Sequence, residues 1–131
     1  MERAAWLLSA AFGFLAVALG AFGAHGLKAK MLPLADGAQR LEWWGTGAHY
    51  QAIHALALGL VAMLASRTES AAPKVSVVAF SVGIVLFSGS LYTMTLTGVR
   101  ALGAVTPFGG VAMLVGWGAM LVAALGVRTA P

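Results

Sequence analysis

The sequence predicts an all-α membrane protein: one domain over residues 1–131, with four transmembrane helices in an antiparallel bundle. Of the 131 residues, 60% are hydrophobic and 9% are charged, and the mean hydropathy is +0.90. A soluble domain of this length cannot cover so much apolar surface. Four stretches of at least 24 residues lack Asp, Glu, Lys and Arg, and about 20 apolar residues are enough to cross the hydrocarbon core of a bilayer.

The charged residues at the ends of these stretches place four helices near residues 4–24, 44–65, 75–97 and 108–127. Pro33, Pro73 and Pro107 fall in or beside the connections, where a missing backbone donor does no harm. The short alternating segments of a membrane β-barrel are absent from the sequence. Because the second and third connections are short, we expect the last three helices to be antiparallel neighbours.

The first helix begins like a secretory signal, since Arg3 precedes an apolar stretch that ends in small residues. The stretch is longer than the apolar region of a typical signal peptide. We therefore expect this helix to be retained as a membrane span.

The connection between the first and second helices is longer, over roughly residues 26–43. In and beside it Leu34, Ala38, Leu41 and Trp44 recur at helical spacing, with charged residues elsewhere on the turn. This pattern predicts a short amphipathic segment that lies at the membrane interface and leads into the second helix.

Small residues predict where the helices pack. Transmembrane helices associate by close backbone contact, because lipid tails are as apolar as leucine. The fourth helix has small residues at spacings of three and four, and these are Gly109, Ala112, Gly116, Ala119, Ala123 and Gly126. The first helix has a shorter series, which is Ala16, Gly20 and Ala24. Each series suits the bundle interior or a partner chain, and the alternative is an accident of a chain rich in Gly and Ala.

Several function classes find no support in the sequence. No acidic residue lies deep in a predicted helix, which argues against carboxylate dyads and carboxylate metal sites. Cysteine is absent, so thiolate chemistry is excluded. A basic patch for nucleic acid and a phosphate-binding motif are also absent. We therefore expect a protein that is not an enzyme, with no catalytic residue, metal site or cofactor and no nucleic-acid partner.

Polar side chains inside the predicted helices are the candidate ligand-binding residues, because an unpaired polar group in lipid costs free energy. Thr46, Tyr50 and His54 share one face of the second helix, and a second stripe on the third helix consists of Ser81, Ser88, Tyr92 and Thr95. A pathway for a small solute between the two stripes is one interpretation. The other is that the hydroxyls bond to neighbouring helices or to their own backbone. Trp117 lies near the middle of the fourth helix, and we expect its indole to donate to a carbonyl or hydroxyl of the third helix.

His25 and His54 are the candidates for a shared polar centre. The connection between the first two helices could fold back and bring the end of the first helix to His54. Such a pair could ligate haem or a metal across helices, whereas His49 is rotated by about 140° from His54 and cannot join it on a straight helix. The alternative is that these histidines hydrogen-bond to carbonyls or loop groups.

Several runs of residues together resemble a known family. They are GAFGAHGL at 20–27, YQAIHAL at 50–56, FSGSLY at 87–92, and TPFGG at 106–110 followed by Gly116 and Trp117. The chain resembles the domain of unknown function 423 family, small bacterial inner-membrane proteins similar to human transmembrane protein 256. The resemblance implies a four-helix membrane fold without an established activity, substrate or cofactor. It also implies that seven residues belong to the family pattern: His25, Tyr50, His54, Ser88, Tyr92, Pro107 and Trp117. Trp43, Trp44 and His49 look particular to this sequence.

Taken alone, the sequence does not specify a biochemical function. We expect a multi-pass protein of the cell inner membrane whose partner is the lipid bilayer and which acts by packing, as a homo-oligomer or as an accessory subunit of a larger complex. The alternative is a membrane-embedded binder or conduit for a small molecule, lipid or cofactor, and haem or metal binding through histidines comes third. Four basic residues at each end of the helices leave the orientation undecided.

Overall fold

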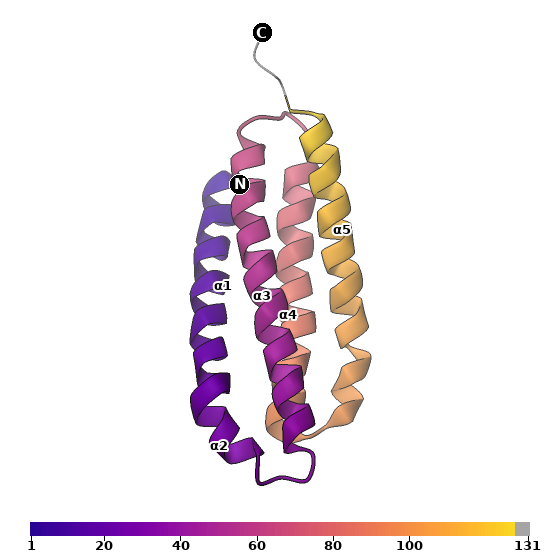
Figure 1. Cartoon of the computed structure of the whole chain (residues 1–131). Coiled ribbons are helices and arrows are strands. Elements are labelled where there is room, and N and C mark those ends of the chain that lie inside the picture. Colours follow the sequence, from indigo (N-terminus) through magenta and orange to yellow (C-terminus); the bar gives the residue numbers. More distant parts are fainter. Residues whose placement is uncertain (128–131) are drawn as a thin grey trace.

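Four helices that are long and apolar enough to cross a membrane make up most of the structure, a computed structural model that describes residues 1–127 (Figure 1). The first span combines α1 (Glu2–Phe22), a π-helical turn η1 (Gly23–Leu27) and α2 (Lys28–Met31). The other elements are α3 (Gly37–Ala65), α4 (Ala72–Thr97), the 3-10 turn η2 (Arg100–Ala104) and α5 (Thr106–Leu125). The predicted four-helix membrane fold is confirmed.

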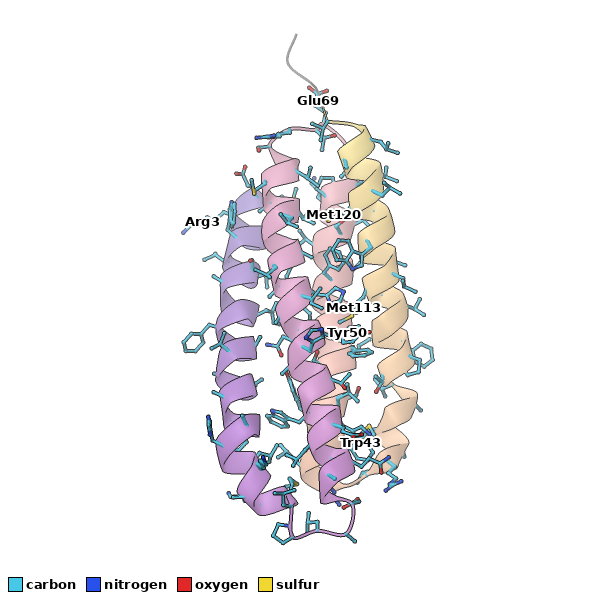
Figure 2. The ribbon with its side chains drawn as sticks, viewed as in Figure 1. Arg3, Trp43, Tyr50, Glu69, Met113 and Met120 are labelled. Carbon is cyan, nitrogen blue, oxygen red and sulfur yellow. The ribbon has the colours of Figure 1, made fainter. Side chains whose placement is uncertain are left out.

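The helices pack in chain order. α1 packs against α3, α3 against α4, and α4 against α5, whereas α3 and α5 meet only briefly. In Figure 1, α1 and α5 stand at opposite edges of the row of helices. Arg3 and Glu69 lie at one end of the molecule and Trp43 lies toward the other (Figure 2). The start of the first span and the α3–α4 connection therefore lie at one end and the start of α3 lies at the other, as antiparallel helices require.

The first connection differs from the prediction. The first span continues to Met31 and α3 begins at Gly37, so only residues 32–36 join them. The residues predicted to form one amphipathic segment are therefore divided between the end of the first span and the first turns of α3. Its periodic apolar residues reflect packing between helices instead: Leu41 and Trp44 pack with Leu27 of the first span.

A π-helical turn in the first span lies beside the Trp44 side chain. The indole of Trp44 donates a hydrogen bond to the carbonyl of Leu19 at 2.8 Å. A Cβ atom on Gly23 would overlap the same indole ring, so the close approach requires glycine. π-Helical structure is rare and occurs mostly as single turns within α-helices.

The main apolar core lies where α3 and α4 meet, with contributions from α1 and α5. Phe80 of α4 and Leu58 of α3 are completely buried in it. The small-residue series of α5 faces α4: Gly109, Gly116 and Ala123 are buried, and Ala112 and Ala119 are half-buried. The α5 series therefore serves contacts within this chain.

The small-residue series of the first helix packs only in part. Ala16 is buried, but Ala24 is exposed. A side chain on Gly20 would meet no atom within 4 Å. Gly20 and Ala24 therefore do not pack inside the bundle, because the helix presents a different set of small positions to α3, with Ala5, Ala16 and Gly23 buried. Packing of Gly20 and Ala24 against a partner chain stays a prediction.

Charged and polar groups join α3 to α4 at the Trp43 end. Arg40 donates to Asp36 at 2.9 Å and to the carbonyl of Thr95 at 3.2 Å, and the Thr95 hydroxyl donates back to the carbonyl of Arg40. Arg100 lies 3.8 Å from the second oxygen of Asp36 and over the ring of Trp43. Gly98 ends α4 with a φ of 75° beside the Arg40 guanidinium, a left-handed conformation that favours glycine.

Candidate functional site

A groove runs between α3 and α5 on the outer surface of the molecule. Because these two helices meet only briefly, they leave a volume of about 590 Å³, with Phe87 of α4 among its lining residues. This volume is within the usual range of ligand pockets. The lining residues are His49, Tyr50, Ile53, His54, Phe87, Pro107, Gly110, Val111, Met113, Leu114 and Trp117.

His54 and Trp117 connect the two walls of this groove. Nδ1 of His54 lies 2.7 Å from the carbonyl of Tyr50, and a carbonyl can only accept, so Nδ1 carries the proton. Nε2 is then the acceptor for the indole N–H of Trp117, at 3.1 Å. Both nitrogens of His54 are engaged, which leaves no lone pair for a metal or haem iron.

The side chains of Tyr50 and His49 also line this groove, and their polar atoms have no hydrogen-bond partner among the described residues. Tyr50 lies about halfway along the helices (Figure 2), and its ring packs on Phe87 at 4.6 Å between centroids. Within residues 1–127, neither the Tyr50 hydroxyl nor the exposed His49 ring makes a side-chain hydrogen bond. Tyrosine usually lies at the membrane surface rather than at mid-depth, and an unpaired polar group in lipid costs free energy.

The second predicted stripe lies inside the α3–α4 contact rather than in the groove. The Ser88 hydroxyl donates to the carbonyl of Gly47 at 2.8 Å, and the Tyr92 hydroxyl donates to Oε1 of Gln51 at 2.9 Å. Thr46 is exposed. The hypothesis of a pathway between the two stripes is therefore wrong, because Ser88 and Tyr92 join α4 to α3. The buried Ser81 hydroxyl has no hydrogen-bond partner among the described residues.

Gln51 is a polar core residue that was not among the candidates predicted from the sequence. It is 3% exposed, and its amide nitrogen donates to the carbonyl of Phe12 at 2.9 Å while its oxygen accepts from Tyr92. The side chain thus connects α1, α3 and α4. The sequence does indicate such a role, because Gln51 is the only amide side chain in the charge-free part of the second helix.

The structure brings together Tyr50, His54 and Trp117 but leaves His25 apart. His25 is exposed on the η1 turn, and both nitrogens of His54 bond elsewhere. The hypothesis of a shared His25–His54 centre is wrong. The expected partner of Trp117 is also corrected, because its indole donates to His54 of α3 rather than to a hydroxyl or carbonyl of α4. Residues 1–127 contain no group of three or more His, Asp or Glu placed to hold a metal ion.

Comparison with known proteins gives one family. The family described as "Protein of unknown function (DUF423)" matches residues 19–110. The chain is 45% identical over 121 residues to the UPF0382 membrane protein YwdK of Bacillus subtilis, covering 91% of this chain and 94% of that protein. It is 44% identical over 122 residues to the UPF0382 inner membrane protein YgdD of Escherichia coli, covering 93% and 89%.

A staphylococcal relative, the UPF0382 membrane protein SERP0230 of Staphylococcus epidermidis, is 40% identical over 119 residues, which cover 91% of this chain and 93% of the relative. No solved structure matches the chain. The resemblance identified from the sequence is confirmed, and so is the predicted localisation in the inner membrane. The chain belongs to the DUF423 family and is a multi-pass protein of the cell inner membrane.

Proposed function

We propose that this protein is a non-enzymatic membrane component that binds an uncharged, lipid-soluble amphipathic molecule in the α3–α5 groove. The observation that carries the proposal is the unpaired Tyr50 hydroxyl on the wall of an otherwise largely apolar groove at mid-depth. A bound molecule with a small polar group would satisfy this hydroxyl, and the exposed His49 ring offers a second contact. Its apolar part would lie along Val111 and Leu114.

The lining residues favour a ligand without charge. No Lys, Arg, Asp or Glu lines the groove, and an ion without a partner is costly away from water. A tyrosine hydroxyl and a neutral imidazole can each donate and accept one hydrogen bond. Tyr50, Phe87 and Trp117 offer aromatic surfaces to a planar or unsaturated group. A neutral lipid that carries a ketone, hydroxyl or ester group meets these requirements.

A second groove of about 520 Å³ on the outer face of α4 and α5 provides a useful contrast. Except for Lys74, its walls consist of valine and alanine side chains. An ordinary lipid tail suits such a surface, and no hydrogen-bonding group along its apolar length would fix one molecule in one orientation. The α3–α5 groove differs because it combines apolar walls with polar groups at mid-depth.

The test is native mass spectrometry of the protein purified in mild detergent. The wild type is expected to retain a molecule of defined mass, and Gly110→Leu should displace it by filling the groove. A Cβ atom on Gly110 would lie 3.9 Å from Phe87, an ordinary contact, so a side chain can begin there without a clash. Gly118→Leu is the matched control, since a Cβ on Gly118 meets no atom within 4 Å and this residue does not line the groove. Retention that is unchanged in Gly110→Leu would overturn the proposal.

The second candidate is a packing role, in which a helix of another copy or of a larger complex fills the same groove. The exposure of Leu114, at 71%, and of Val111, at 59%, favours it because a partner helix would bury both. The chain has no cysteine, so Leu114→Cys provides its single thiol for oxidation in native membranes. A disulfide-linked dimer would support the packing role, with Val17→Cys on the exposed face of α1 as the control.

A further inference from the structure

A separate groove lies between the end of the first span and α3. It has a volume of about 340 Å³, and its lining residues are Gly20, Gly23, Ala24, Lys28, Leu41, Trp44, Gly45 and Ala48. A Cβ atom built on Gly20 or on Gly45 would meet no atom within 4 Å. The floor of the groove is therefore open and formed by small residues, and Trp44 and Leu41 supply apolar walls.

Lys28 places an unpaired positive charge at this groove. Its side chain is exposed, and it forms no ion pair within the described part of the chain. Asp36, the acidic residue of the adjoining connection, is already held by Arg40 and Arg100. Lys28 lies three residues before the end of the first span at Met31, which is roughly 4.5 Å along a helix. Long basic side chains near the ends of membrane spans typically reach the level of the lipid headgroups.

We infer that this groove binds an anionic phospholipid. Lys28 contacts the phosphate, and the first part of one acyl chain lies across Gly20 and Gly45 against the Trp44 wall. Charge complementarity decides the occupant, because basic pockets between transmembrane helices recognise anionic headgroups. This site is independent of the α3–α5 groove, with which it shares no lining residue.

The experiment compares dioleoylphosphatidylglycerol, which is anionic, with dioleoylphosphatidylcholine, which is zwitterionic. Each lipid is titrated into the delipidated full-length protein in detergent, and bound lipid is counted by native mass spectrometry. The wild type is expected to favour the anionic lipid about fivefold, the ratio that corresponds to one lysine near an anionic surface. Lys28→Gln should remove this preference, and Gly45→Leu should weaken binding of both lipids by occupying the floor.

Lys30→Gln is the matched control, since Lys30 is exposed at the same end of the same span but does not line the groove. It should keep the preference for the anionic lipid. Equal binding of the two lipids by the wild type would overturn the inference, as would equal losses in Lys28→Gln and Lys30→Gln, which indicate general attraction to a basic surface. Gly110→Leu should leave this binding unchanged, so failure here is distinguishable from failure of the proposed function.

Discussion

The indole nitrogen of Trp117 lies 3.1 Å from Nε2 of His54, whose other nitrogen is bonded to the backbone of its own helix. This contact joins α5 to α3, two helices that otherwise meet only briefly. Both side chains also line the α3–α5 groove. The distance between the walls of the groove therefore depends on one hydrogen bond together with the packing of both rings on Phe80.

Trp117→Phe is expected to destabilise the protein by about 1 kcal/mol. Phenylalanine keeps most of the apolar contact but leaves Nε2 of His54 without its donor, and side-chain hydrogen bonds in membrane proteins contribute about this much. The measurement is thermal unfolding in detergent. Trp6→Phe is the control, because Trp6 is exposed to a similar extent, 47% against 41%. Equal melting of the two variants would contradict the role of the His54 contact.

Tyr92 and Gln51 should be energetically coupled. Tyr92→Phe leaves the buried oxygen of Gln51 unpaired, and Gln51→Leu removes the acceptor of the Tyr92 hydroxyl. Each single variant is expected to cost about 1 kcal/mol, whereas the double variant should cost clearly less than the sum. A double-mutant cycle on unfolding free energies measures the difference, which should be at least about 0.5 kcal/mol. Additive effects would show that the two side chains act independently.

Gly116→Leu should disrupt the contact between α4 and α5. A Cβ atom at this position would lie 2.5 Å from Cδ1 of Phe80, a completely buried ring, so the ring or the helices must move. Overpacking of this kind costs roughly 1–3 kcal/mol. Gly118→Leu introduces the same side chain on the same helix into open space. If the two variants melt at the same temperature in detergent, the close approach at Gly116 does not stabilise the fold.

The membrane spans could be predicted because charge and hydropathy alone decide where a chain crosses a bilayer. The packing of the α5 series could be predicted for a similar reason, since small residues at heptad spacing mark a close contact between helices. Gly109 lies against the backbone of Phe87, and Gly116 lies against the ring of Phe80. The structure of the first connection could not be predicted from the sequence. Leu41 and Trp44 have the same spacing whether their apolar face rests on lipid or on another helix, and only the tertiary fold distinguishes the two.

The site was predictable in part. Tyr50 and His54 share one helical face in any helix, and the structure keeps both at the groove. The partner of Trp117 could not be deduced, because helical periodicity gives the direction of a side chain but not which neighbouring helix it meets. The same limit explains the hypothesis about His25, whose position depends on the η1 turn. Gln51 lies about 100° from Tyr50 on the helix and therefore faces α1 and α4 instead.

The last prediction concerns Asp36 and the pH dependence of stability. The hydrogen bond from Arg40 is the main cause that lowers the pKa of Asp36 below its ordinary value of 3.8. A carboxyl group with a lowered pKa in the folded state stabilises that state above its unfolded pKa, and the contribution is lost as pH falls through the folded pKa. We therefore expect Asp36→Asn to melt earlier than the wild type at pH 7, and the difference to shrink below about pH 4.

The control for Asp36→Asn is Glu42→Gln, which removes another carboxylate near the same end of α3. Glu42 itself forms no ion pair among residues 1–127. It should leave the melting temperature at pH 7 and its pH dependence almost unchanged. Melting curves between pH 3 and 7 in one detergent provide the comparison. Asp36 is exposed enough for salt to screen its charge, so raising the ionic strength should also reduce the difference at pH 7. A difference that persists unchanged at pH 3 would mean that Asp36 acts through its shape or its hydrogen bonds as a neutral group, rather than through its charge on Arg40.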